Sequence, residues 1–214
     1  MTAPIESRPS LGRLVWTPVG LMLVALAAMW AIEIVDTVLL DDELQSHGLG
    51  PRRADGLDGI LWAPFLHSDF GHIASNSVPF LALGGLVAAR GMRYWGWVTA
   101  VVIIVGGGAT WLLGGSGIHI GASGVVFGYF GAILGAAVFE RRVRALGAAL
   151  IALGFYSSLI AGVIPQPSIS WEGHLFGLVA GVIASKVLAE PRREPDKEPY
   201  KPEPWELDEP WNIA

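Results

Sequence analysis

A serine within a glycine-rich stretch is the first candidate for chemistry in this chain. Ser123 lies in Gly121-Ala122-Ser123-Gly124, which follows a glycine-rich loop and opens an apolar segment. We expect the serine at a helix N-terminus, where free backbone N–H groups and the helix dipole stabilise an oxyanion. The alternative is a plain helix cap beside a packing motif, because Val125 replaces the last glycine of the Gly-x-Ser-x-Gly elbow.

His174 is the candidate general base, near the start of the last apolar segment. It shares a helical face with Gly177 and Gly181, three and seven residues further on. Such glycine faces allow two helices to approach closely. The segment that begins at Ser123 has a glycine face of its own, formed by Gly124, Gly128, Gly131 and Gly135. If the two faces meet, the serine and the imidazole come within hydrogen-bond reach as nucleophile and base. Alternatively, the histidine only fills a packing position.

Three polar side chains mark the start of the second apolar segment. His72 and Asn76 are four residues apart and therefore share one helical face, and His67 lies just before them in a loop. They can supply inward-pointing hydrogen-bond donors, or they can bond to one another and tie down the loop. For His67 we favour the structural role. A zinc site is disfavoured, because Asp69 is the one carboxylate nearby.

Four other polar side chains are expected to lie outside the reaction centre. Glu33 and Asp36, at the end of the first segment, should reach the membrane interface. His119 could line the mouth of the site, but we expect a solvated loop residue. Glu172 is two residues from His174 and should point to a different side of the helix.

Long apolar segments must hold these side chains. Hydrophobic residues make up 52% of the 214 residues and charged residues 15%, whereas a soluble domain carries about 25% charged residues. A helix needs roughly 20 apolar residues to cross a bilayer. The sequence therefore predicts an all-α membrane protein with six spans, at residues 15–37, 72–90, 94–113, 123–140, 145–164 and 171–189.

The positive charges predict the orientation of these spans. Lysine and arginine favour the cytoplasmic side of a membrane, and with six spans most of them fall on one side: Arg8, Arg13, Arg90, Arg93, Arg141, Arg142, Arg144, Lys186, Arg192 and Arg193. We therefore expect both termini in the cytoplasm. The expected organisation is a cytoplasmic segment at 1–14, a membrane domain at 15–189 and a Pro-rich acidic cytoplasmic tail at 190–214, which should be disordered.

Composition also excludes several kinds of site. The chain has no cysteine, which excludes disulfides, thiol nucleophiles and zinc–thiolate centres. A net charge of −5 is not typical of a nucleic-acid-binding protein. We expect no metal ion, no cofactor and no nucleic acid partner.

In this arrangement the chain resembles the rhomboid family of intramembrane serine proteases. The resemblance covers residues 15 to 189 and rests on three motifs, on the second, fourth and sixth segments: His67-x4-His72-x3-Asn76, Gly121-x-Ser123-Gly124 and Gly173-His174-x2-Gly177-x3-Gly181. It implies a six-helix rhomboid-like bundle and a serine–histidine dyad without an acidic third member.

The resemblance also implies a role for each matching residue. Ser123 would be the nucleophile, His174 the base, and His72 and Asn76 the oxyanion donors together with the Ser123 backbone N–H. The residues that would support the site are His67, Phe127, Gly121, Gly124 and Gly177.

The chain departs from the family pattern in two places. Phe127, which would stack on the histidine, stands where some members have Tyr. The Trp-Arg pair of the first loop is absent, and the corresponding region ends in Trp62.

The implied function is cleavage of transmembrane segments in other membrane proteins. The expected partners are such substrates and the lipid bilayer, and the oligomeric state stays open. The compact core without an organelle-targeting extension suggests a bacterial plasma membrane. One alternative is a catalytically silent rhomboid-like protein that binds membrane clients, and another is a small transporter, although we find no inverted repeat.

Overall fold

The computed structural model describes residues 17–166 and 169–189, so the segments expected at 1–14 and 190–214 lie outside the described residues. Within the described residues all regular structure is helical. The long helices are α2 (Pro18–Leu39), α4 (Phe70–Ala88), α5 (Met92–Val101), α6 (Gly107–Leu113), α7 (Ser123–Glu140), α8 (Val143–Tyr156) and α9 (Trp171–Val187). A π turn, Val102–Gly106, joins α5 to α6, and a 3-10 segment, Ser157–Val163, extends α8. The loop between α2 and α4 holds α3 (Gly59–Trp62) and three 3-10 turns, Glu43–His47, Ala54–Gly56 and Ala63–Phe65.

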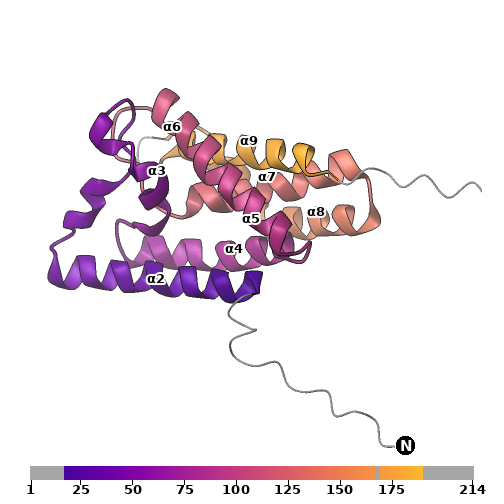
Figure 1. Cartoon of the computed structure of the whole chain (residues 1–214), viewed down its shortest axis with the longest axis horizontal. Helices are drawn as coiled ribbons and strands as arrows, with labels where there is room; N and C mark the ends of the chain where they lie inside the picture. Colours follow the sequence, from indigo (N-terminus) through magenta and orange to yellow (C-terminus); the bar gives the residue numbers. More distant parts are fainter. Residues whose placement is uncertain (1–16, 167–168, 190–214) are drawn as a thin grey trace, which may run out of the picture.

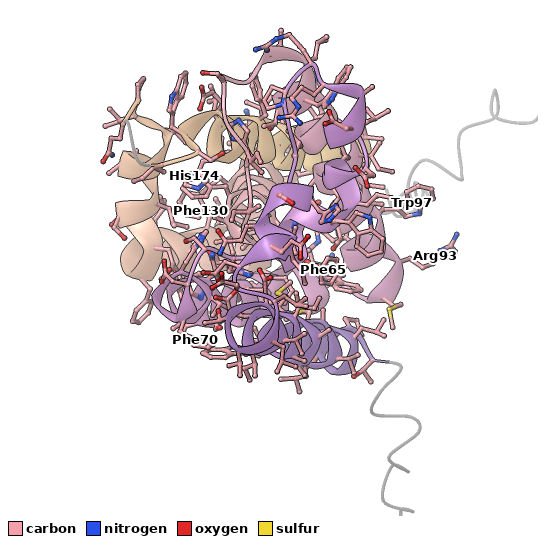
Figure 2. All side chains as sticks on the ribbon, turned by 90° about the vertical axis from the view of Figure 1, so that its left-hand side faces the viewer. Phe65, Phe70, Arg93, Trp97, Phe130 and His174 are labelled. Carbon is pink, nitrogen blue, oxygen red and sulfur yellow. The ribbon has the colours of Figure 1, made fainter. Side chains whose placement is uncertain are left out.

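Helix α7 forms the centre of the bundle. Figure 1 shows α9 running beside α7, α2 and α4 lying side by side, and α5 crossing over the central helices. Of the α7 span, 72% of the residues are buried. Figure 2 shows His174 and Phe130 in the interior, while Arg93 and Trp97 point outward. Helix α7 can therefore carry chemistry at one end, shielded from lipid by its neighbours.

The two predicted glycine faces meet between α7 and α9. A Cβ atom added at Gly177 would overlap the carbonyl group of Gly124, and one at Gly181 would overlap that of Gly128. At Gly131, an added Cβ would overlap the carbonyl of Leu178 in the same way. The helices thus touch backbone to backbone, which only glycine permits.

Five of the helical segments are long and apolar enough to cross a membrane, counted over the described residues: Pro18–Leu39, Phe70–Ala88, Met92–Leu113, Ser123–Glu140 and Val143–Val163. The sixth expected span forms α9, a helix of 17 residues that is not among these five.

Two helices begin where a side chain caps them. Thr17 accepts a hydrogen bond from the Gly20 N–H at 3.1 Å, with Pro18 in the first turn. Asp69 accepts from the His72 N–H at 2.8 Å. These caps fix the observed starts of α2 and α4, which differ from the expected ones by a few residues.

The expectation for Glu33 and Asp36 was wrong. Each is only 2% exposed and lies within the protein instead of reaching the interface. The chain after α2 folds back over the helix end, and the Leu44 N–H donates to the Asp36 carboxylate at 2.9 Å. Asp36 thus anchors the start of the long loop.

The same loop is fixed to the segment that precedes α7. Leu49 and His119 exchange two backbone hydrogen bonds, of 3.0 and 2.9 Å. Further along, the Gly121 N–H donates to the Ala63 carbonyl at 2.9 Å. The loop therefore determines where the chain enters α7, and hence where Ser123 lies.

Candidate active site

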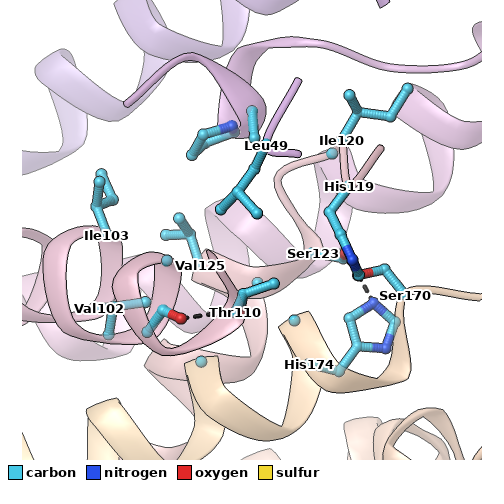
Figure 3. A pocket seen from close by; sticks show the side chains of 18 of the residues that line it. Leu49, Val102, Ile103, Thr110, His119, Ile120, Ser123, Val125, Ser170 and His174 are labelled. Atoms are coloured by element: carbon cyan, nitrogen blue, oxygen red, sulfur yellow. Dashed lines mark hydrogen bonds between the residues drawn. The ribbon is translucent and has the colours of Figure 1, made fainter. Parts of the chain in front are cut away.

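Ser123 and His174 are hydrogen-bonded where α7 and α9 begin. The distance from Ser123 Oγ to His174 Nε2 is 2.8 Å (Figure 3). His174 Nδ1 lies 2.9 Å from the carbonyl oxygen of Gly162. A carbonyl only accepts, so Nδ1 carries the proton of the neutral ring, and Nε2 is left free to accept a proton from the serine. A backbone carbonyl thus orients this imidazole.

Phe127 covers the face of the histidine ring. The two rings stack with centroids 4.2 Å apart and planes inclined by 7°. A Cβ atom at Gly162 would lie 2.6 Å from Phe127 Cζ and 3.2 Å from His174 Nδ1. The 3-10 segment can therefore bring its carbonyl to the imidazole only because position 162 is glycine.

His72 and Asn76 of α4 converge on the peptide just before Ser123. A Cβ atom at Gly121, whose φ is +111°, would lie 2.7 Å from His72 Nε2 and 3.6 Å from Asn76 Nδ2. His72 Nδ1 accepts from the Ser68 N–H at 3.4 Å, which puts the ring proton on Nε2. Asn76 Nδ2 is buried without a hydrogen-bond partner among the described residues. Two side-chain N–H donors are thus available at one place.

His67 supports the backbone next to the serine. It is 1% exposed, and its Nε2 accepts from the Ala122 N–H at 3.3 Å. Burial, and then the neighbouring His72, lower the pKa of His67 to about 4. The neutral ring that results is the form that can accept this hydrogen bond. No group of three or more His, Asp or Glu side chains in the described part of the chain is arranged to hold a metal ion.

A small cavity adjoins the dyad. It has a volume of about 60 Å³ and is lined by Ser123, His174 and His119, together with apolar side chains that include Val102 and Ile103 (Figure 3). On this measure one water molecule needs roughly 10–15 Å³, so the cavity has room for several water molecules or a small side chain.

Comparison with known proteins assigns the family. Residues 56–191 match the Rhomboid domain. The chain belongs to the rhomboid family. It is also 36% identical over 171 residues to an uncharacterized protein of Mycobacterium bovis, which covers 75% of this chain and 71% of the relative. An uncharacterized protein of Mycobacterium leprae is 36% identical over 181 residues, covering 79% of this chain and 71% of the relative. The family match and the five long apolar helices together show that this rhomboid is a multi-pass integral membrane protein.

His119 and Ser170 lie beside the dyad of this rhomboid, although neither was predicted to be part of the site. His119 is half-buried and lines the cavity, whereas a solvated side chain was expected. Its Nδ1 is hydrogen-bonded to Ser170 Oγ, and its Nε2 is buried without a partner among the described residues. Ser170 was missed, although its position four residues before His174 at the start of α9 was a usable signal.

Glu172 lies away from the dyad, as its spacing predicted. Its carboxylate accepts a hydrogen bond from the Gly115 N–H at 3.1 Å. It therefore holds the loop before α7 near the start of α9. Gly162, which supplies the acceptor for His174, was also missed, because a backbone carbonyl has no signature in residue type.

Proposed function

We propose that this rhomboid is an intramembrane serine endopeptidase that cleaves transmembrane segments of other membrane proteins. The observation that carries the proposal is the 2.8 Å hydrogen bond from Ser123 to a His174 ring whose other nitrogen is bonded to a carbonyl. Nucleophile, base and an orienting group are thus in line, as acyl transfer requires.

The reaction begins with attack of Ser123 Oγ on the scissile carbonyl carbon, while His174 Nε2 takes the serine proton. The carbonyl oxygen becomes an oxyanion and accepts hydrogen bonds from His72, Asn76 and the Ser123 N–H. His174 then gives its proton to the leaving amine. Water, deprotonated by the same imidazole, hydrolyses the acyl-enzyme and restores Ser123.

The topology belongs to the same proposal. Helix α9 is the sixth span: 17 residues rise about 25 Å, close to the roughly 30 Å of the hydrocarbon core, and α7 covers its glycine face. Both termini are cytoplasmic, the membrane domain covers 15–189, and 190–214 is a cytoplasmic tail. The dyad then lies toward the outer side of a bacterial plasma membrane, and the matched relatives are mycobacterial.

Substrate choice follows from backbone hydrogen bonding. A transmembrane helix bonds its own carbonyls, so the scissile peptide must unwind before Ser123 can reach it. Segments with helix-breaking residues unwind most easily. The 60 Å³ cavity beside the dyad favours a small side chain next to the cleaved bond.

Cleavage of a model transmembrane substrate in proteoliposomes tests the proposal. The native chain should cut, and Ser123→Ala and His174→Ala should not. Ser46→Ala is the matched control, because Ser46 is an exposed serine of the long loop. If the native chain is inert on several substrates and a fluorophosphonate probe fails to label Ser123, the protein is a catalytically silent binder of membrane clients instead.

A further inference from the structure

A second cavity lies at the far end of α7 from the dyad. Glu140 closes α7 at this end, about 25 Å along the helix from Ser123. The cavity has a volume of about 470 Å³, within the range of small-molecule sites. Its walls come from α4, α5, α7 and α8 and are mostly apolar, with Leu86, Ile133, Ala136, Ala148 and Ile151 among them.

Two buried polar atoms in this cavity lack hydrogen-bond partners. The Glu140 side chain is 1% exposed, and its Oε1 accepts from Arg90 Nη2. Its Oε2, and the hydroxyl of Tyr94, are buried with no partner among residues 17–166 and 169–189. The Arg90 guanidinium also lies 3.8 Å above the Tyr94 ring, which holds these three side chains together. Buried polar atoms are normally paired, so these two atoms have unused capacity for hydrogen bonds to a bound molecule.

The chemistry of the walls defines the ligand. A carboxylate oxygen only accepts, and a charged N–H donor forms the strongest bond to it. Arg144, an exposed lining residue, adds a positive charge suited to a phosphate. Ile151 is half exposed on α8, so the apolar part of the cavity reaches the outer surface of the helix bundle. The ligand therefore combines an ammonium group, a phosphate and an apolar chain.

We propose that this cavity binds a phospholipid with a primary amine headgroup, as in phosphatidylethanolamine. The ammonium group donates to Glu140 Oε2 and to the Tyr94 oxygen, the phosphate faces Arg144, and an acyl chain leaves along Ile151. This site shares no residue with the dyad, so the lipid proposal does not depend on the proposed protease activity.

The test measures lipid binding to the delipidated full chain in detergent by native mass spectrometry. Phosphatidylethanolamine should bind about tenfold more tightly than phosphatidylcholine or phosphatidylglycerol, since one charge-assisted hydrogen bond contributes about that factor. Glu140→Gln should abolish the preference. Equal binding of the three lipids, or a preference unchanged in Glu140→Gln, would overturn the proposal. Free phosphoethanolamine should not compete; if it binds as well as the lipid, the site takes a soluble ligand.

A second pair of variants separates occupancy from folding, because Glu140→Gln also weakens the ion pair with Arg90. Gly147 lines the cavity and Gly154 lies on the same helix outside it, and a Cβ at either position meets no atom within 4 Å. Gly147→Leu should fill the cavity and reduce phosphatidylethanolamine binding about tenfold or more, while Gly154→Leu should bind like the native chain. Equal binding by the two variants would place the lipid elsewhere.

Discussion

Helix α7 meets its neighbours in two different ways. Toward α9 it presents glycines, and the two backbones touch. Toward α8 it contacts side chains and leaves a cavity of about 470 Å³. Only 11% of the α8 span is buried, against 72% of α7. Both sides of α7 affect the dyad. The distance between Ser123 and His174 depends on the tight interface of α7 with α9. The orientation of the His174 ring depends on the carbonyl of Gly162, in the loosely packed segment after α8.

The largest effect is expected from breaking the tight interface. Gly181→Val places a side chain where the Gly128 carbonyl lies, so α9 must move away from α7. Overpacking of this kind typically destabilises a protein by about 1–3 kcal/mol. Cleavage should become undetectable, and the midpoint of thermal unfolding should fall by several degrees in proteoliposome and detergent assays. Gly154→Val, at an open position of α8, is the control; similar losses there would remove the distinction between the two interfaces.

A smaller effect is expected where α4 contributes through a side chain. Asn76→Ala removes one N–H donor beside Gly121 and does not alter the glycine contacts between α7 and α9. Loss of one oxyanion donor lowers kcat about 100- to 1,000-fold. KM and the unfolding midpoint should change little. A proportionate rise in KM with unaltered kcat would instead make Asn76 a substrate-binding residue.

The loosely packed side can be tested at Gly162. Gly162→Ala introduces a Cβ that would lie 2.6 Å from Phe127 Cζ, so the 3-10 segment must shift and its bond to His174 must lengthen. Because none of the residues of that segment is buried, we expect almost no change in stability. We expect kcat to fall about tenfold, which is roughly the contribution of one hydrogen bond. A lower kcat at unchanged stability would show that the segment orients the His174 ring without contributing to folding. An unfolding midpoint lowered as far as in Gly181→Val would show that this side is not loose.

The smallest effect concerns pH. The pKa of His67 is lowered to about 4 in the folded protein, against a usual value of 6.5. As the pH falls, the unfolded chain therefore takes up a proton at this histidine before the folded protein does. The His67 contribution to stability is therefore complete above about pH 6.5 and is lost as the pH falls toward 4. His67→Gln should flatten the dependence of the unfolding midpoint on pH in this window. His47→Gln, at an exposed histidine, should keep the native slope.

Much of this arrangement was predictable because it depends on residue type and spacing. The glycine faces of α7 and α9 follow from intervals of three and four, and their meeting brings Ser123 to His174. The observed ends of the helices differ from the predicted ends by a few residues, because capping side chains such as Asp69 determine where a helix begins.

Features that depend on the backbone of loops were not predictable. The chain after α2 folds back and buries Glu33 and Asp36, which an amphipathic pattern would leave at the surface. His119 is drawn into the site by its backbone pairing with Leu49, a contact between segments that are 70 residues apart. The carbonyl of Gly162 belongs to the same class, because any residue type has one.

The carbonyl that holds His174 has a consequence for how this site tolerates change. Every amino acid carries a backbone oxygen, so a substitution at position 162 can displace this acceptor but cannot remove it. It also carries no net charge, so it holds the buried imidazole without the cost of burying an ionised carboxylate beside it. Changes in this part of the site therefore act through the course of the chain: Gly162→Ala should weaken the bond to His174, and an insertion or deletion between α8 and α9 should remove it.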